Sequence, residues 1–256
     1  MDTQTYDPVE EISAGPEPVI PGLVLLCDHA SNAIPPAIGT LGLPSEDMAR
    51  HIAWDIGARD VVLALAAKLG APAVLSRFSR LVIDPNRGPK DPTLVMRLYD
   101  GTPIPGNRAV DADDISARRA NLHQPYHDRI SAVIDGMIAA GTQPHLISVH
   151  SFTRQLRGKA SRPWHAGVLW DQDFRLAGPL LDILRADGDL VVGDNEPYLG
   201  SLPGDTMWTH GTSRGLPHAL IEIRNDLIAD EFGASAWADR LAQLIPEAVW
   251  KMENST

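Results

Sequence analysis

Two histidines stand where apolar runs of the sequence end. His29 closes the segment that begins with Leu23–Cys27, and His150 directly follows Leu146–Val149. Apolar runs of this length are typical of buried strands, and open α/β sheets build their sites beyond the carboxyl ends of such strands. Histidine is the commonest metal ligand in proteins. Two strand-end imidazoles that converge would therefore predict a shared metal site.

A catalytic zinc needs about three protein ligands and an open position, so a third ligand is required. We expect a carboxylate, Asp55, in the segment that starts at His51. Two alternatives stay open: Asn32 could supply an oxygen, although a neutral amide suits zinc poorly, or His51 and Asp55 could form a hydrogen bond on a helix surface. Asp28 is expected to point away from His29, yet it could orient a ligand from behind.

Arginines flank a short apolar run in the segment 76–87. Arg80 precedes the run, and Asn86 and Arg87 follow it. Guanidinium groups bind carboxylates through two parallel hydrogen bonds, so this cluster predicts an acidic substrate. The alternative is that Arg80 and Arg87 pair with Asp84 or with other carboxylates of this acidic chain.

A late apolar run, Ala219–Ile223, carries Glu222 and is followed by Arg224. In a strand with alternating side chains, these two residues share one face. A buried carboxylate at this place could act as a general base on a metal-bound water, whereas a solvated surface charge is the ordinary alternative. His210 and residues 195–198, on the preceding loop, could also reach the site.

Other catalytic signatures are missing from the sequence. It contains no GxSxG elbow, no P-loop, no dinucleotide fingerprint after the first strand and no CxxC pair. A Ser-His-Asp triad stays open, because triads are assembled in space rather than along the chain.

The composition indicates a globular protein of moderate size. The 256 residues suffice for one large domain or two small ones, and the net charge of −11 argues against a nucleic-acid partner. No stretch approaches the roughly 20 apolar residues of a membrane span. The acidic N-terminus does not resemble a signal peptide, and a single cysteine, Cys27, suits a reducing cytoplasm. Cytoplasmic localisation is therefore expected, with Cys27 as a small buried hydrophobe.

The elements that must position these residues alternate between strands and helices. Residues 1–21, rich in proline and acidic side chains, predict a flexible arm, and residues 22–256 a single domain. Strands are predicted at about 22–28, 72–77, 80–84, 165–170, 189–193 and 217–223 and at a run ending at His150, with helices at about 45–69, 111–140, 173–186 and 234–251. This alternation predicts an α/β fold with a largely parallel or mixed sheet, whose long loops (86–110, 151–163 and 194–216) carry the polar residues.

Taken together and in chain order, these segments resemble the N-formylglutamate amidohydrolase family. The matching segments are Asp28–Asn32, Trp54-Asp55, Ser79–Arg87, Val149–Phe152, Asn195–Tyr198, His210-Gly211 and Ile221–Asp226, which cover about residues 23–228. The resemblance implies a fold related to zinc carboxypeptidases and of the phosphorylase/hydrolase-like kind. This fold is a three-layer αβα sandwich whose mixed, largely parallel sheet has about eight strands.

The resemblance also implies roles for individual residues. In the wider group a first histidine and a later strand-end histidine bind the metal, an Asn-Arg pair holds the substrate carboxylate and a late-strand glutamate activates water. His29, His150, Asn86-Arg87 and Glu222 match these positions.

The chain departs from the usual His-x-x-Glu of that group, because Asn32 stands where the glutamate is expected. Asp55 is therefore expected to complete a site for Zn²⁺ or another divalent transition metal. The implied reaction is hydrolysis of the amide bond of an N-acyl amino acid, foremost N-formyl-L-glutamate to formate and L-glutamate. The implied catalytic residues are Glu222 and His210, and the residues that hold a small acidic substrate are Arg80, Asn86, Arg87 and Arg224.

Two other functions remain open at this stage. One is hydrolysis of a different N-acyl amino acid, or a carboxypeptidase-like amidase activity, on the same scaffold. The other is non-catalytic binding of small carboxylates, which would need the arginines but neither a metal nor a base. The sequence gives no indication of the oligomeric state.

Overall fold

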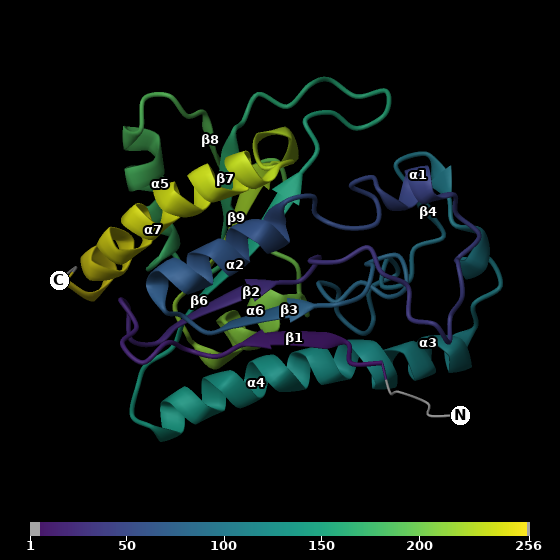
Figure 1. Cartoon of the computed structure of the whole chain (residues 1–256), viewed down its shortest axis with the longest axis horizontal. Coiled ribbons are helices and arrows are strands. Elements are labelled where there is room, and N and C mark those ends of the chain that lie inside the picture. Colours follow the sequence, from purple (N-terminus) through teal and green to yellow (C-terminus); the bar gives the residue numbers. More distant parts are fainter. Residues whose placement is uncertain (1–5, 255–256) are drawn as a thin grey trace.

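The structure, a computed structural model, describes residues 6–254 and is built around a seven-stranded sheet in the order β1-β3-β2-β6-β9-β7-β8 (Figure 1). Strands β3, β2, β6 and β9 run parallel, whereas β1 pairs antiparallel with β3 and β7 antiparallel with β9. The predicted mixed, largely parallel sheet is therefore confirmed. The strands are β1 (Val9–Ile12), β2 (Leu23–Cys27), β3 (Ala73–Ser76), β6 (His145–Phe152), β7 (Ala166–Leu169), β8 (Val192–Asp194) and β9 (His218–Arg224), and β4 (Leu98–Tyr99) and β5 (Thr102–Pro103) form a separate hairpin.

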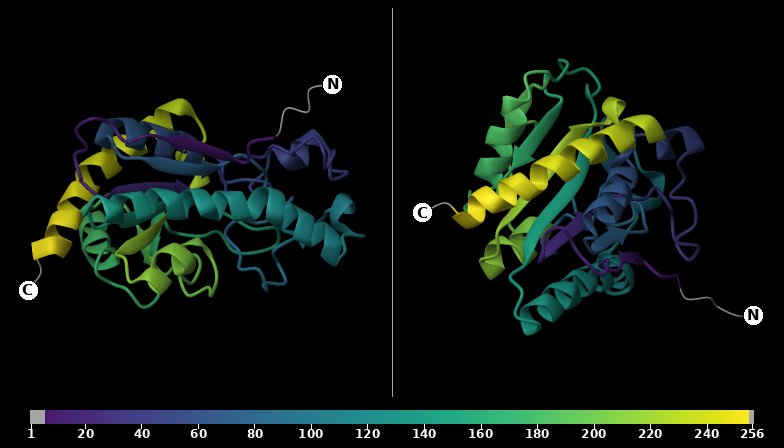
Figure 2. Two further views of the ribbon diagram at one scale, coloured as in Figure 1. Left: turned by 90° about the horizontal axis from the view of Figure 1, so that it is seen from below. Right: turned by 60° about the vertical axis from the view of Figure 1, so that its left-hand side comes forward.

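Helices cover both faces of the sheet and give the predicted three αβα layers (Figure 2). Leu25 and Cys27 of β2 face one apolar core, and Val24 and Leu26 face the other, because side chains alternate along a strand. A strand buried on both faces must be apolar throughout, which explains the continuous run that ends before His29. The first core is covered by α2 (Ala58–Leu69), α5 (Ala177–Ala186) and α7 (Glu231–Asn254), and the second by α4 (Gln124–Ala139) and α6 (Thr206–His210).

The predicted helix at 45–69 is interrupted, and the interruption carries Asp55. It consists of α1 (Ser45–Met48) and α2, with Asp55 in the turn between them. Gly57 has a φ of 80°, and a Cβ there would lie 1.9 Å from the carbonyl oxygen of Ile228. The turn therefore requires glycine. It brings the Asp55 amide to 3.0 Å from the His29 carbonyl oxygen, to which it donates.

The predicted strand at 80–84 is wrong. Leu81 and Ile83 are fully buried, but they belong to a third apolar core beneath the irregular segments rather than to the sheet. The backbone turns here: the Val82 amide donates to the Ser79 carbonyl at 2.9 Å, and the Leu81 amide donates to Ser79 Oγ at 3.2 Å. The apolar residues therefore anchor a turn, and the polar residues on either side of them, Arg80 and Asp84, enter the site.

Two further segments differ from the sequence expectations. The predicted helix at 111–140 is α3 (Ala112–Arg118), a π-helical turn (Arg119–His123) and α4, which has Pro125 in its first turn. Residues 1–5 of the predicted flexible arm lie outside the described residues, but Val9–Ile12 form the edge strand β1, because its backbone pairs with β3. Among residues 6–254, no helix combines the length and the hydrophobicity that a bilayer crossing requires.

Candidate active site

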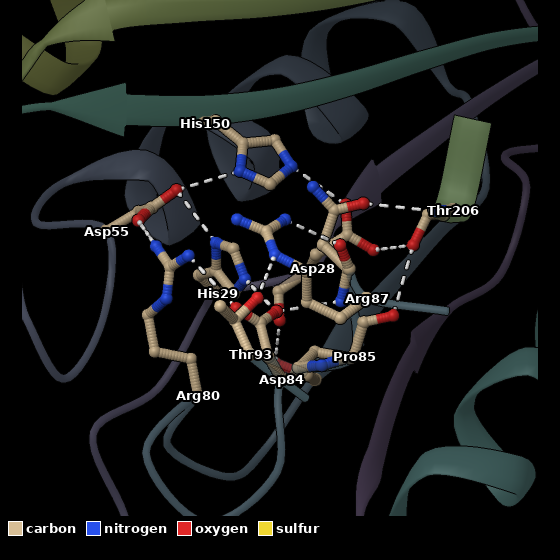
Figure 3. A network of polar contacts seen from close by, with 12 residues as sticks. Asp28, His29, Asp55, Arg80, Asp84, Pro85, Arg87, Thr93, His150 and Thr206 are labelled. Carbon is tan, nitrogen blue, oxygen red and sulfur yellow. Dashed lines mark hydrogen bonds and ion pairs between the residues drawn. The ribbon is translucent and has the colours of Figure 1, made fainter. Parts of the chain in front are cut away.

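His29, just beyond β2, meets Asp55 and His150, which lies near the carboxyl end of β6 (Figure 3). The Nδ1 atoms of His29 and His150 lie 3.3 and 2.9 Å from the same Asp55 Oδ2. One ligand atom from each of the three residues lies within 4.8 Å of the other two, and all three residues are buried. The parallel pairing of β2 with β6 sets the separation of the two imidazoles, and the turn before Gly57 supplies the carboxylate.

Two further aspartates hold the outer nitrogens of the histidines. Asp28 Oδ2 lies 2.8 Å from His150 Nε2, and Asp84 Oδ1 lies 2.7 Å from His29 Nε2. Because a carboxylate only accepts hydrogen bonds, each Nε2 donates to its aspartate. The Nδ1 atoms face Asp55 Oδ2 at the shared centre and are the atoms that a metal ion would take. Metal-ligating histidines are oriented by carboxylates in this way.

Asp28 is fixed by hydroxyl groups as well as by His150. Its carboxylate accepts hydrogen bonds from the hydroxyls of Tyr126, Ser148 and Thr206 at 3.0, 2.9 and 2.5 Å. Burial raises the pKa of Asp28, but the hydrogen bond and the charge of His150 outweigh burial and hold that pKa below its ordinary value. Asp28 therefore points away from His29, as expected. It is ionised and orients His150.

The donor set suits a divalent transition metal. Two imidazole nitrogens and one carboxylate oxygen are ligands typical of catalytic zinc. Asp28, Asp55 and Asp84 are three buried carboxylates, and Arg80 forms ion pairs with Asp55 and Asp84, so the cluster is rich in the negative charge that a divalent ion would neutralise. Asn32 takes no part, because its Nδ2 donates to the carbonyl of Met48 at 2.9 Å.

Arg80 lines the pocket but is held by the protein's own carboxylates. Its Nη1 lies 3.4 Å from Asp55 Oδ1 and its Nη2 lies 3.0 Å from Asp84 Oδ2. Burial lowers the pKa of Arg80, whereas the neighbouring Tyr99 and the aspartates raise it above its ordinary value. The ion-pair alternative therefore describes Arg80, and only its Nε lacks a hydrogen-bond partner among residues 6–254.

Asn86 and Arg87 also line the pocket, but unlike Arg80 they are held by neutral groups. Arg87 is fixed through Nη1 to the carbonyl of Asn86 at 2.8 Å and through Nε to the Thr93 hydroxyl at 3.1 Å. Asn86 Oδ1 accepts from the Thr206 amide at 3.1 Å. In the described part of the chain, no carboxylate lies within ion-pair distance of Arg87. Its guanidinium therefore has no anionic partner among the described residues.

Glu222 reaches the same pocket from β9, where its register partner on β6 is His150. The side chain is buried, and its Oε2 has no hydrogen-bond partner among the residues that the structure describes. Burial raises the pKa of Glu222 to about 7, and the Asp55 charge adds to the rise, while His150 opposes it. A carboxylate with such a pKa can both accept and release a proton near neutral pH.

Two predicted site residues have no contact with this cluster. Arg224 Nε donates to Asp226 Oδ1 at 2.7 Å, and its Nη1 donates to the carbonyl of Trp164 at 3.3 Å. His210 Nε2 lies 2.8 Å from His127 Nδ1 behind the site, and burial lowers the pKa of His210 to about 3. Neither residue lines the pocket.

The pocket has a volume of about 380 Å³ and extends beyond the charged cluster to an apolar side. Sequence reasoning missed this side, which includes Trp170 and Trp208. It also treated Asp84 only as an ion-pair partner of the arginines, although Asp84 is the residue that orients His29. One feature of the sequence could have indicated this role: Asp84 lies between Arg80 and Arg87 in a segment that resembles the family.

Comparison with known proteins identifies the family of the chain. A family model described as N-formylglutamate amidohydrolase matches residues 22–229. The crystal structure of gene product Atu2144 from Agrobacterium tumefaciens is similar, with 36% identity, a TM-score of 0.90 and coverage of 98% of both chains. An N-formylglutamate amidohydrolase from Ralstonia eutropha JMP134 has 17% identity and a TM-score of 0.71 over 97% of this chain and 99% of that one.

A metallo-carboxypeptidase from Pseudomonas aeruginosa is more distant, with 13% identity and a TM-score of 0.41 over 94% of this chain and 61% of that one. A search of curated proteins gave no match. The family match spans both strand-end histidines, the arginine segment and the late-strand glutamate. The chain therefore belongs to the N-formylglutamate amidohydrolase family and is an amidohydrolase.

Proposed function

We propose that this enzyme hydrolyses the amide bond of a small N-acyl amino acid and depends on zinc or another divalent transition metal, with N-formyl-L-glutamate as the reference substrate. The observation that carries the proposal is the convergence of His29 Nδ1, His150 Nδ1 and Asp55 Oδ2 within 4.8 Å, with Glu222 paired beside His150. A binder of carboxylates would need neither this donor set nor a buried carboxylate with a raised pKa.

His29, Asp55 and His150 would hold the ion. When bound, a divalent metal supplies a Lewis acid that polarises a carbonyl group and makes water a stronger nucleophile at neutral pH. Asp28 and Asp84 accept from the two Nε2 atoms and so direct the Nδ1 atoms toward the ion, and Arg80 holds Asp55 and Asp84 in place.

Glu222 acts as the general base and then as the general acid. It accepts a proton from the attacking water, and the hydroxyl adds to the acyl carbon. Glu222 then returns the proton to the nitrogen as the carbon–nitrogen bond breaks, so that formate and glutamate leave from the reference substrate. A pKa of about 7 suits both steps, because the driving force for each transfer is then similar.

Asn86 and Arg87 bind the carboxylate of the amino-acid part. Arg87 lies on the pocket wall with His29 and Glu222 and pairs with no carboxylate of the described chain. A guanidinium–carboxylate pair would fix the scissile amide relative to Glu222, and such positioning contributes strongly to rate.

The test measures metal content and deformylase activity together. The wild type stripped with a chelator is expected to lose activity and to regain it with zinc, manganese or cobalt. His150→Ala is expected to lose both bound zinc and activity. The matched control is His145→Ala, at the opposite end of the same strand beside Glu253, which should keep both. Full activity of the rigorously metal-free wild type would refute metal dependence.

A further inference from the structure

We propose that the substrate of this enzyme carries a large apolar group, preferably an aromatic one, in addition to the carboxylate that Arg87 binds. The inference rests on the proposed function and names its substrate class. It departs from glutamate, whose side chain ends in a second carboxylate, and it follows from the half of the pocket that lies beyond Glu222.

The apolar half of the pocket begins one pleat beyond the general base. Leu220 lies on the same face of β9 as Glu222, two residues or about 7 Å along the strand. Its register partner on β7, Leu169, lines the pocket as well. Trp170, Met207 and Trp208 complete this wall. A group attached next to the scissile amide would therefore reach apolar side chains.

Exposed apolar side chains also line the pocket. Trp208 is 40% exposed, Leu199 77% and Tyr198 39%, and all three line the pocket. Trp170 packs on Phe174 with ring centroids 4.4 Å apart, which presents a broad aromatic surface. Clustered exposed apolar side chains at a pocket mark a site that gains stability when an apolar ligand covers it.

A second substrate carboxylate would find no free arginine or lysine among the residues that line the pocket. Arg162 lies outside this lining, against the Tyr198 ring, and its Nη1 donates to the Thr153 carbonyl and the Tyr198 hydroxyl. Arg87 is taken by the first carboxylate, and Arg80 offers one N–H of a guanidinium that Asp55 and Asp84 already neutralise. The pKa of His51, on the same pocket, is lowered by burial, so its imidazole is neutral at pH 7.

The pocket lining also contains carboxyl groups, which do not attract a second carboxylate. Asp171 and Asp205 line the pocket with the two tryptophans. His218 offers little in return, because its Nδ1 donates to the carbonyl of Leu216 at 2.8 Å and its Nε2 lies 3.1 Å from the Thr212 hydroxyl. The carboxylate of a glutamate side chain would therefore lose its hydration without gaining a hydrogen-bond or ion-pair partner. A phenyl ring carries no polar group and does not incur this cost.

The test compares kcat/KM of the zinc-loaded enzyme for four compounds. N-formyl-L-phenylalanine places the aromatic group on the side chain, and N-benzoylglycine places it on the acyl group. N-formyl-L-glutamate and N-formyl-L-lysine are the charged competitors. We expect one of the two aromatic compounds to exceed both charged ones by at least about tenfold. Preference for glutamate or lysine would overturn the inference alone, and no turnover of any compound would overturn the proposed function with it.

A pair of variants tests the wall directly. Trp208→Ala is expected to lower the ratio of kcat/KM for the preferred aromatic compound to that for N-formyl-L-glutamate by about tenfold. Trp250→Ala is the matched control, because Trp250 is 63% exposed on α7 and does not line the pocket. An equal loss for both compounds in Trp208→Ala would contradict the inference.

Discussion

Replacing Asp84 by asparagine should weaken metal binding without removing a ligand. The Asp84 carboxylate accepts from three donors: His29 Nε2 at 2.7 Å and the Asn86 amide at 2.9 Å on Oδ1, and Arg80 Nη2 at 3.0 Å on Oδ2. An asparagine has the same shape but only one oxygen. It must therefore turn an NH₂ group either toward Arg80 or toward His29 and the Asn86 amide.

Both orientations oppose the metal. If the NH₂ group faces His29, the ring must move its hydrogen from Nε2 to Nδ1, which blocks the lone pair directed at the ion. If it faces Arg80, two donors confront each other and the ion pair is lost. Loss of such outer partners typically lowers metal affinity by about 10- to 100-fold. This corresponds to about 1.4 to 2.7 kcal/mol.

The assay is competition for zinc against a chromophoric chelator at neutral pH. The matched control is Asp239→Asn, which removes a charge from an exposed pair with Lys68 far from the site in the fold. Thermal unfolding of both variants establishes that each is folded at the assay temperature. If Asp84→Asn binds zinc as tightly as Asp239→Asn, the hydrogen bond to Asp84 does not set the tautomer of His29, and the reasoning is refuted.

Three further predictions concern the base, the pocket and the turn. Glu222→Gln should lower kcat by about 10²- to 10⁴-fold with bound zinc retained, measured by single-turnover kinetics and metal analysis; near-normal kcat would exclude Glu222 as the base. Burial raises the pKa of Asp205 from 3.8 to about 7. The folded state therefore binds the Asp205 proton more tightly than the unfolded state does. This contribution to the free energy of unfolding is complete below about pH 4 and is lost as the pH rises to about 7. Relative to Asp205→Asn, urea unfolding of the wild type should therefore show a loss of up to about 4 kcal/mol across this window, and parallel pH profiles would contradict it. Gly57→Ala should cost at least about 2 kcal/mol more than Gly141→Ala in the same assay, because Gly141 shares the positive φ but a Cβ there meets nothing within 4 Å. Equal costs would show that Ile228 can move aside.

The features that the sequence predicted correctly are those encoded by local patterns. The apolar runs before His29 and in front of His150 form β2 and β6, because a strand buried on both faces needs continuous apolar residues. Cys27 lies within such a run and is fully buried, as expected. The strand β6 continues past His150 to Phe152, and the two imidazoles meet because β2 and β6 pair in parallel.

What the sequence did not predict depends on contacts between distant segments. The sequence predicted a strand at Leu81–Ile83, because three consecutive apolar residues do not indicate which apolar core they pack in. The role of Asp84 required knowing that the turn behind it faces His29, 55 residues earlier. The apolar half of the pocket draws on β7, β9 and α6, so no single segment displays it.

The edge strand β1 has a practical consequence for handling the protein. The family match begins at residue 22, yet β1 lies before it and covers β3. Glu10 Oε1 lies 2.7 Å from Arg59 Nη2, and the Tyr6 hydroxyl donates to the carbonyl of Arg77. Side-chain contacts therefore hold this segment in addition to the strand pairing. A chain trimmed to the family boundary would expose Ala73–Ser76, an apolar strand with free backbone groups and a ready template for self-association. Samples for crystallisation or kinetics should therefore keep residues 6–21, so that β3 stays covered.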